Sequence, residues 1–145
     1  MKCVMVFVVF IVGAVAQAKC VNLSGRYVDD PTDVGEIYTI SQVGCEKLTV
    51  DTAVVYGPHY KDVLVMDGVF RVLKGQFDVI YRKTAFIDDV MIVEALAFKP
   101  DGSFTYSERS RVSLDASANI VDEIHDYDAD GNVTSSKTQI LYRKN

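Results

Sequence analysis

The chain has 145 residues, of which 15 are basic and 20 acidic, so its formal net charge is −5. This acidic balance argues against nucleic acid as a partner, because binding to the phosphate backbone depends on a basic surface. The length suits one domain with a single core, and no Pro-, Gly- or Ser-rich linker divides the chain.

The first eighteen residues have the pattern of a secretory signal peptide. Lys2 supplies the positive amino end, residues 4–16 form an apolar run, and Ala16-Gln17-Ala18 places small residues at both cleavage-determining positions. The run is shorter than the roughly 20 apolar residues that a membrane-spanning helix needs. We therefore expect residues 1–18 to be removed, leaving a single domain over residues 19–145 with no membrane span and a secreted or periplasmic location.

Two cysteines remain after removal of the signal. Cys3 leaves with it, so Cys20 and Cys45 are the only pair in a chain bound for an oxidising compartment. We expect them to form a structural disulfide, which stabilises a fold by about 2–4 kcal/mol through restriction of the unfolded chain.

The rest of the chain alternates apolar and polar residues with period two, which is typical of half-buried β-strands. Turn signals separate the strands, for example Asp67-Gly68, Pro100-Asp101-Gly102 and Asp130-Gly131-Asn132. The pattern predicts an all-β antiparallel meander of ten candidate strands over residues 25–28, 36–42, 47–56, 62–66, 69–74, 77–86, 90–98, 103–114, 120–127 and 133–143.

A meander of this length either closes into a barrel, which removes its edges, or splits into a β-sandwich. The segment Gly25-Arg26-Tyr27 and the late Arg143 resemble the lipocalin-like, or calycin, family. That family opens its first strand with Gly-x-Trp and packs an arginine from its last strand across the tryptophan; here Tyr27 takes the place of that tryptophan. The resemblance implies an up-and-down barrel of about 8–10 strands, and a β-sandwich is the alternative.

Turn lengths in the second half of the chain predict how its strands align. We expect a two-residue loop at Asp88-Asp89, three-residue loops at residues 100–102 and 129–131, and a four-residue loop at residues 115–118. These turns align an aromatic row of Tyr81, Leu96, Tyr106, Tyr127 and Val133, and beside it a polar row of Lys83, Glu94, Glu108, His125 and Ser135.

The polar row places two acids, Glu94 and Glu108, opposite each other, so Lys83 and His125 are expected to compensate them. Three interpretations stay open. The row is a satisfied polar network; or it lies beside a cavity where Lys83, Glu94, Glu108, His125 and Ser135, with Tyr81, Tyr106 and Tyr127, orient a small ligand; or its acid pair cleaves glycosides.

No sequence motif indicates a catalytic residue, a metal site or a cofactor. The Asp-rich segment at residues 126–131 resembles the start of a calcium-binding loop, but the twelfth position is Lys137 where a glutamate ligand belongs, so a hairpin turn is expected. Two functions therefore remain open: a carrier that holds a small hydrophobic ligand in a barrel interior, and an interaction module of the cell envelope, such as an inhibitor or adaptor, with a filled core.

Overall fold

The computed structural model describes residues 19–32, 35–74 and 78–144, so the expected signal peptide lies outside the described residues. All the regular structure in these ranges is β-strand. The strands are β1 (Gly25–Val28), β2 (Glu36–Val43), β3 (Lys47–Val54), β4 (His59–Val65), β5 (Arg71–Lys74), β6 (Val79–Ile87), β7 (Val90–Phe98), β8 (Phe104–Leu114), β9 (Ile120–Tyr127) and β10 (Val133–Lys144).

All ten predicted strands are present, and every pairing is antiparallel; apart from the β1–β10 pair, each joins strands that are consecutive in the chain. The predicted start of the sixth strand at residue 77 lies outside the described part of the chain. The prediction of an all-β antiparallel meander is therefore confirmed.

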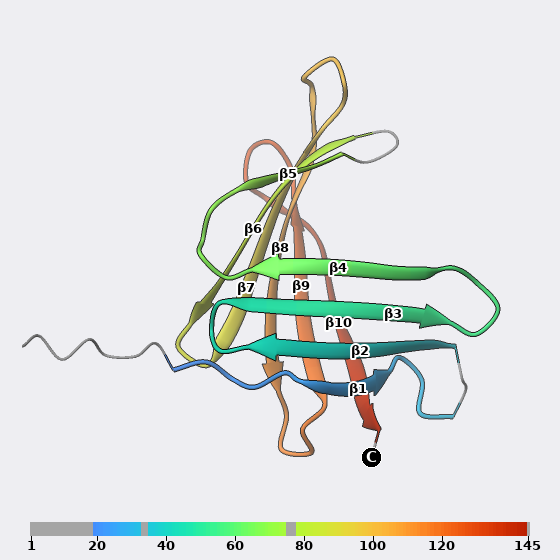
Figure 1. Cartoon of the computed structure of the whole chain (residues 1–145). Helices are drawn as coiled ribbons and strands as arrows, with labels where there is room; N and C mark the ends of the chain where they lie inside the picture. Colours follow the sequence, from blue (N-terminus) through green and yellow to red (C-terminus); the bar gives the residue numbers. More distant parts are fainter. Residues whose placement is uncertain (1–18, 33–34, 75–77, 145) are drawn as a thin grey trace, which may run out of the picture.

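The sheet runs in the order β4-β3-β2-β1-β10-β9-β8-β7-β6-β5, so the first and last strands pair in its middle and the edges are β4 and β5. Strands β1–β4 form a layer that lies across β6–β10 (Figure 1). The hydrogen-bonded ladder does not close between β4 and β5, so barrel closure stays a prediction.

Side-chain and backbone contacts nevertheless hold β4 against β6. Arg82 donates two hydrogen bonds to the Asp62 carboxylate, at 2.5 and 2.8 Å. The Thr84 hydroxyl donates to the Val65 carbonyl at 2.7 Å. The edge strand β4 is thus linked by polar contacts to β6, the neighbour of the other edge strand, without a continuous strand ladder.

The hydrophobic core lies where the two layers cross. Leu23, Tyr27, Ile40, Leu48 and Leu64 from the β1–β4 side pack with Met91, Val112 and Ile120 from the β7–β9 side. The Cys20–Cys45 disulfide is present, with the two Cα atoms 5.6 Å apart, as the sequence predicted. It ties the segment before β1 to the turn after β2, at one end of this core.

Tyr27 and Arg143 join the first strand to the last. Tyr27 is fully buried, and its hydroxyl donates to the Leu23 carbonyl at 3.1 Å. Arg143 faces Tyr27 across the β1–β10 ladder, with its guanidinium carbon 5.9 Å from the ring centroid. The contact that the lipocalin-like resemblance implied is thus present.

The far ends of β5–β9 extend beyond the layer formed by β1–β4 (Figure 1). On these strands, one side chain in two faces the β1–β4 layer, and the alternate ones point away from it. We call the second set the outer face. The candidate site lies on it.

Candidate functional site

The observed polar row on the outer face contains Lys83, Glu94, Arg109, His125 and Ser136. The β6–β7 register is the predicted one, because Lys83 faces Glu94 and Tyr81 faces Leu96. The remaining three registers each differ from the prediction by one residue over most of their length. A shift of one residue moves a side chain to the other face of the sheet.

The predicted pairing of Glu94 with Glu108 is wrong. The turn after β7 forms as predicted, with Gly102 at a φ of 86° and Phe98 opposite Phe104. Next to it, however, β8 contains a bulge at Thr105, because Ala97 faces Tyr106 while Phe98 faces Phe104. Glu94 therefore faces Arg109, and both Glu108 and Tyr106 point toward the β1–β4 side.

The predicted pairs between β8 and β9 are also wrong. The Asp115 amide donates to the Asn119 carbonyl at 3.0 Å, which closes a three-residue loop in place of the expected four. Ala118 adopts a φ of 60°, a conformation that a non-glycine residue seldom takes. His125 consequently faces Arg109, and Tyr127 faces Ser107.

Between β9 and β10, Tyr127 faces Val133 as predicted, but the prediction for Ser135 is wrong. A bulge at Thr134 shifts the following residues, so that His125 faces Ser136 and Ser135 lies opposite Asp126 on the other face. His125 Nδ1 and the Ser136 hydroxyl are hydrogen-bonded at 2.8 Å.

The observed register replaces the expected acid pair with a compensated ion cluster. Glu94 pairs with Lys83, and its Oε1 lies 3.7 Å from Nε of Arg109. The Lys83 ammonium also lies 4.9 Å from the ring centroid of Phe70, in cation–π geometry. One carboxylate therefore holds two cations on the outer face, and the cluster does not have the two opposed carboxylates that glycoside cleavage would need.

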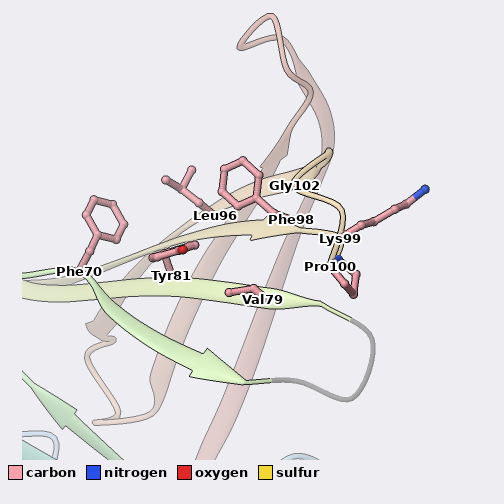
Figure 2. A pocket seen from close by; sticks show the side chains of 8 residues that line it. All are labelled: Phe70, Val79, Tyr81, Leu96, Phe98, Lys99, Pro100 and Gly102. Atoms are coloured by element: carbon pink, nitrogen blue, oxygen red, sulfur yellow. The ribbon is translucent and has the colours of Figure 1, made fainter.

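An apolar groove lies next to the ion cluster. Its volume is about 590 Å³, and its lining includes Phe70, Val79, Tyr81, Leu96 and Phe98 (Figure 2). Figure 2 shows Phe70, Leu96 and Phe98 rising from the same side of the sheet. Lys99, Pro100 and Gly102 line its end at the β7–β8 turn.

Edge-to-face aromatic contacts order one wall of this groove. The Phe98 ring lies 5.9 Å from Tyr81 and 5.8 Å from Phe104, centroid to centroid, with nearly perpendicular planes. Such pairs add to the stabilisation from burial alone. The ring contacts thus hold the groove wall in an ordered arrangement, in which Tyr81 remains partly exposed to solvent.

The groove continues into a second hollow of about 370 Å³, which shares Phe70 and Leu96 with it and also contains Glu94, Arg109 and Tyr127. The structure therefore brings together four of the predicted site residues, namely Lys83, Glu94, Tyr81 and Tyr127; Tyr81 lines the groove and Tyr127 lines the second hollow. It places His125 farther along the polar row, beside Ser136. Tyr106 and Ser135 lie on the other face, as does the Glu108 carboxylate.

The side of the sheet that faces β1–β4 carries a separate group of acids. Glu108 lies opposite Asp126, and burial together with the Asp126 charge raises the pKa of the Glu108 carboxyl. Burial raises the pKa of Asp122 to about 6, although a hydrogen bond from Ser110 opposes that shift. Asp122 also lines a partly open cavity of about 190 Å³ between the two layers.

The sequence did not predict three residues of these sites: Phe70 and Arg109 at the groove and ion cluster, and Asp122 in the cavity between the layers. Asp122 had a signal, since it stands between Ile120 and Ile124 at the spacing of buried residues on a strand. Phe70 lies between a turn and the short edge strand β5, where the alternation of apolar and polar residues does not predict which face of the sheet a side chain occupies. Arg109 would have followed from the correct β7–β8 register.

Within residues 19–32, 35–74 and 78–144, no group of three or more His, Cys, Asp and Glu side chains is placed to hold a metal ion. No helix in those ranges is long and apolar enough to cross a membrane. Comparison of the chain with protein-family models, with curated proteins and with solved structures finds no match.

Proposed function

We propose that this chain is a secreted or periplasmic interaction module that binds an extended apolar segment of a partner protein in the outer-face groove. The observation that supports this most directly is the open hollow of about 590 Å³ beside exposed apolar side chains, among them Phe70 and Tyr81. Large contiguous apolar patches are uncommon on monomeric soluble proteins and often mark binding surfaces.

The shape of the groove favours a polypeptide over a small ligand. A drug-sized molecule is usually held in a pocket that buries 70–90% or more of its surface, whereas this groove lies on the face of a sheet and extends into a second hollow. A polypeptide segment covers such a surface along its length. Aromatic side chains and arginine, which are common in protein interfaces, are the residue types gathered here.

The charges beside the groove favour a segment with an acidic group. Lys83, Arg109 and Lys99 lie in or beside the connected hollows, where Glu94 is the carboxylate that pairs with the first two. The whole chain has a net charge of −5, so this local cationic excess differs from the rest of the surface. Complementary charges speed association and align the partner.

Location and fold class belong to the same proposal. The Cys20–Cys45 disulfide supports an oxidising compartment, and the signal-peptide pattern supports secretion. The up-and-down meander and the packing of Arg143 on Tyr27 support a lipocalin-like barrel that is open along one seam. The partner would then be an extracellular or cell-envelope protein.

Selection from a peptide-display library against the mature chain tests the proposal. We expect enriched peptides to combine alternating apolar residues with an acidic residue, and Tyr81→Asp to weaken their binding at least about tenfold, equivalent to about 1.4 kcal/mol. Val43→Asp is the matched control, because Val43 is an exposed apolar residue of β2 outside the groove. Equal losses in both variants, or peptides that bind Tyr81→Asp as well as the unaltered chain, would refute the proposal.

A further inference from the structure

The interior cavity between the two layers is separate from the outer-face groove. Its volume is about 190 Å³, and Leu48, Met91 and Val112 are among the apolar side chains that form its walls. Apart from Tyr38, Asp122 and Gln139, its lining is apolar. It is smaller than the roughly 300–1,000 Å³ typical of sites for drug-sized ligands, but larger than an engineered apolar cavity of about 150 Å³ that holds benzene.

One polar atom in this cavity wall lacks a partner. Oδ1 of Asp122 is buried and accepts no hydrogen bond from the described part of the chain. Leaving a buried acceptor unsatisfied is unfavourable, and more so for a charged group. The hydrogen bond from Ser110 to the Asp122 carboxylate leaves Oδ1 without a partner, and the Tyr38 hydroxyl donates to Glu36 instead. A donor from outside the chain would remove this cost.

The charges near Asp122 favour a cationic donor. The negative charge of Glu108 raises the pKa of Asp122, and the negative charge of Asp126 raises the pKa of Glu108. Lys137 of β10 lowers the pKa of both Asp122 and Glu108. The three carboxylates of Glu108, Asp122 and Asp126 therefore share one ammonium group on this side of the sheet. Opposite charge stabilises an ionised carboxylate in a partly desolvated site.

We propose that the cavity binds a small primary amine with a compact apolar body. The ammonium group donates to Oδ1 of Asp122, and the apolar body contacts the walls formed by Leu48, Met91 and Val112. The cavity volume of about 190 Å³ suits a body of about one six-membered ring. This site is independent of the outer-face groove and of the partner proposed for it.

Benzylamine is a suitable probe, and toluene is its matched control because it has the same ring without the ammonium group. In an NMR titration of the mature chain near pH 7.5, we expect saturable shifts of the Leu48 and Val112 methyl signals with benzylamine. Toluene should bind at least about tenfold more weakly, equivalent to about 1.4 kcal/mol. Asp122→Asn should weaken benzylamine binding to a similar extent, whereas Asp130→Asn, an exposed acid in a turn, should leave it unchanged.

Thermal unfolding of each variant shows whether it is folded, so a loss of binding is assigned only to folded protein. A cavity-filling Val112→Phe variant provides a second test that leaves Asp122 in place, and it should abolish binding of both probes. The proposal is overturned if benzylamine does not saturate the site below about 10 mM, a very weak affinity. Equal binding of toluene and benzylamine, or unchanged binding in Asp122→Asn, would also overturn it.

Discussion

Glu94 and Arg109 face each other across the β7–β8 ladder, with Oε1 of Glu94 3.7 Å from Nε of Arg109. Because Glu94 also pairs with Lys83, it separates two cations on the outer face. Substituting Glu94 by Gln would leave Lys83 and Arg109 with no intervening negative charge. We expect a loss of about 0.5–1 kcal/mol in the free energy of unfolding, since the cluster is partly exposed.

Urea denaturation of Glu94→Gln measures this loss. Glu123→Gln is the matched control, because Glu123 forms a single, more exposed pair with Arg111 at 3.4 Å. The control should change the free energy of unfolding by less than about 0.5 kcal/mol. If both variants lose the same stability, the three-residue cluster adds nothing beyond an ordinary surface pair.

The pKa of Asp122, raised to about 6 from 3.8, predicts a pH-dependent penalty. A carboxyl whose pKa is higher in the folded state opposes folding above that pKa, and protonation relieves the penalty as the pH falls toward the unfolded value. Each pKa unit corresponds to about 1.4 kcal/mol, and partial solvent screening reduces the sum to about 1–2 kcal/mol. Asp122→Asn should therefore be more stable than the unaltered chain at pH 7.5.

Denaturant titrations of both proteins between pH 4 and pH 7.5 check this prediction. The difference in free energy of unfolding should shrink as the pH falls through about 6, because the unaltered carboxyl then becomes protonated. Parallel stability profiles for Asp122→Asn and the unaltered chain would show that Asp122 is not desolvated.

Glu108 faces Asp126, and its pKa is raised above the usual 4.5, mainly by burial and then by the Asp126 charge. As for Asp122, the ionised form opposes folding, so the unaltered chain gains stability as the pH falls through the raised pKa toward 4.5. Glu108→Gln removes this gain. Its stability should therefore depend less on pH between neutrality and pH 4.5, as measured by thermal unfolding in a pH series.

Asp130→Asn serves as the control for the Glu108 series, because Asp130 is exposed in the β9–β10 turn. Its pH profile should follow that of the unaltered chain. If the Glu108→Gln and Asp130→Asn profiles coincide, Glu108 does not experience the burial described above.

Arg143 stacks over the buried Tyr27 ring and donates to the Ser24 carbonyl at 3.3 Å. Truncation of Arg143 to Ala removes a cation–π contact and a hydrogen bond to the backbone, so we expect a loss of about 1–2 kcal/mol in the free energy of unfolding. Lys144→Ala at the same strand end, whose side chain is exposed, should change it by less than about 0.5 kcal/mol. Equal effects would show that the first and last strands are not joined through this contact.

Much of the fold could be predicted from the sequence, because period-two alternation and Asp-Gly turns are local signals. All ten strands follow from them, and the Cys20–Cys45 bond follows from the expected compartment. The open seam could not be predicted, since whether β4 pairs with β5 depends on the path of the chain between them rather than on strand composition. Closure of the sheet into a barrel depends on long-range contacts, which the alternation of apolar and polar residues along one strand does not determine.

The candidate site was predicted only in part, and the reason is the register. Bulges at Thr105 and Thr134 have no residue signature comparable to a glycine, and the left-handed conformation of Ala118 has none either. Each shifts a strand by one residue and so exchanges its two faces. The expected opposition of Glu94 and Glu108 contained a warning, since like charges opposite each other are unfavourable, and shifting β8 by one residue relieves it with Arg109.

The proposed function depends most on the outer-face groove as a binding surface. An NMR titration with a display-selected apolar peptide tests this most directly. We predict that signals of Val79, Leu96 and Phe98 shift on binding, while core signals such as Leu48 and Leu64 stay in place. Shifts centred on the interior core, or on the β1–β4 layer, with no change at Leu96 and Phe98, would contradict peptide binding in the outer-face groove.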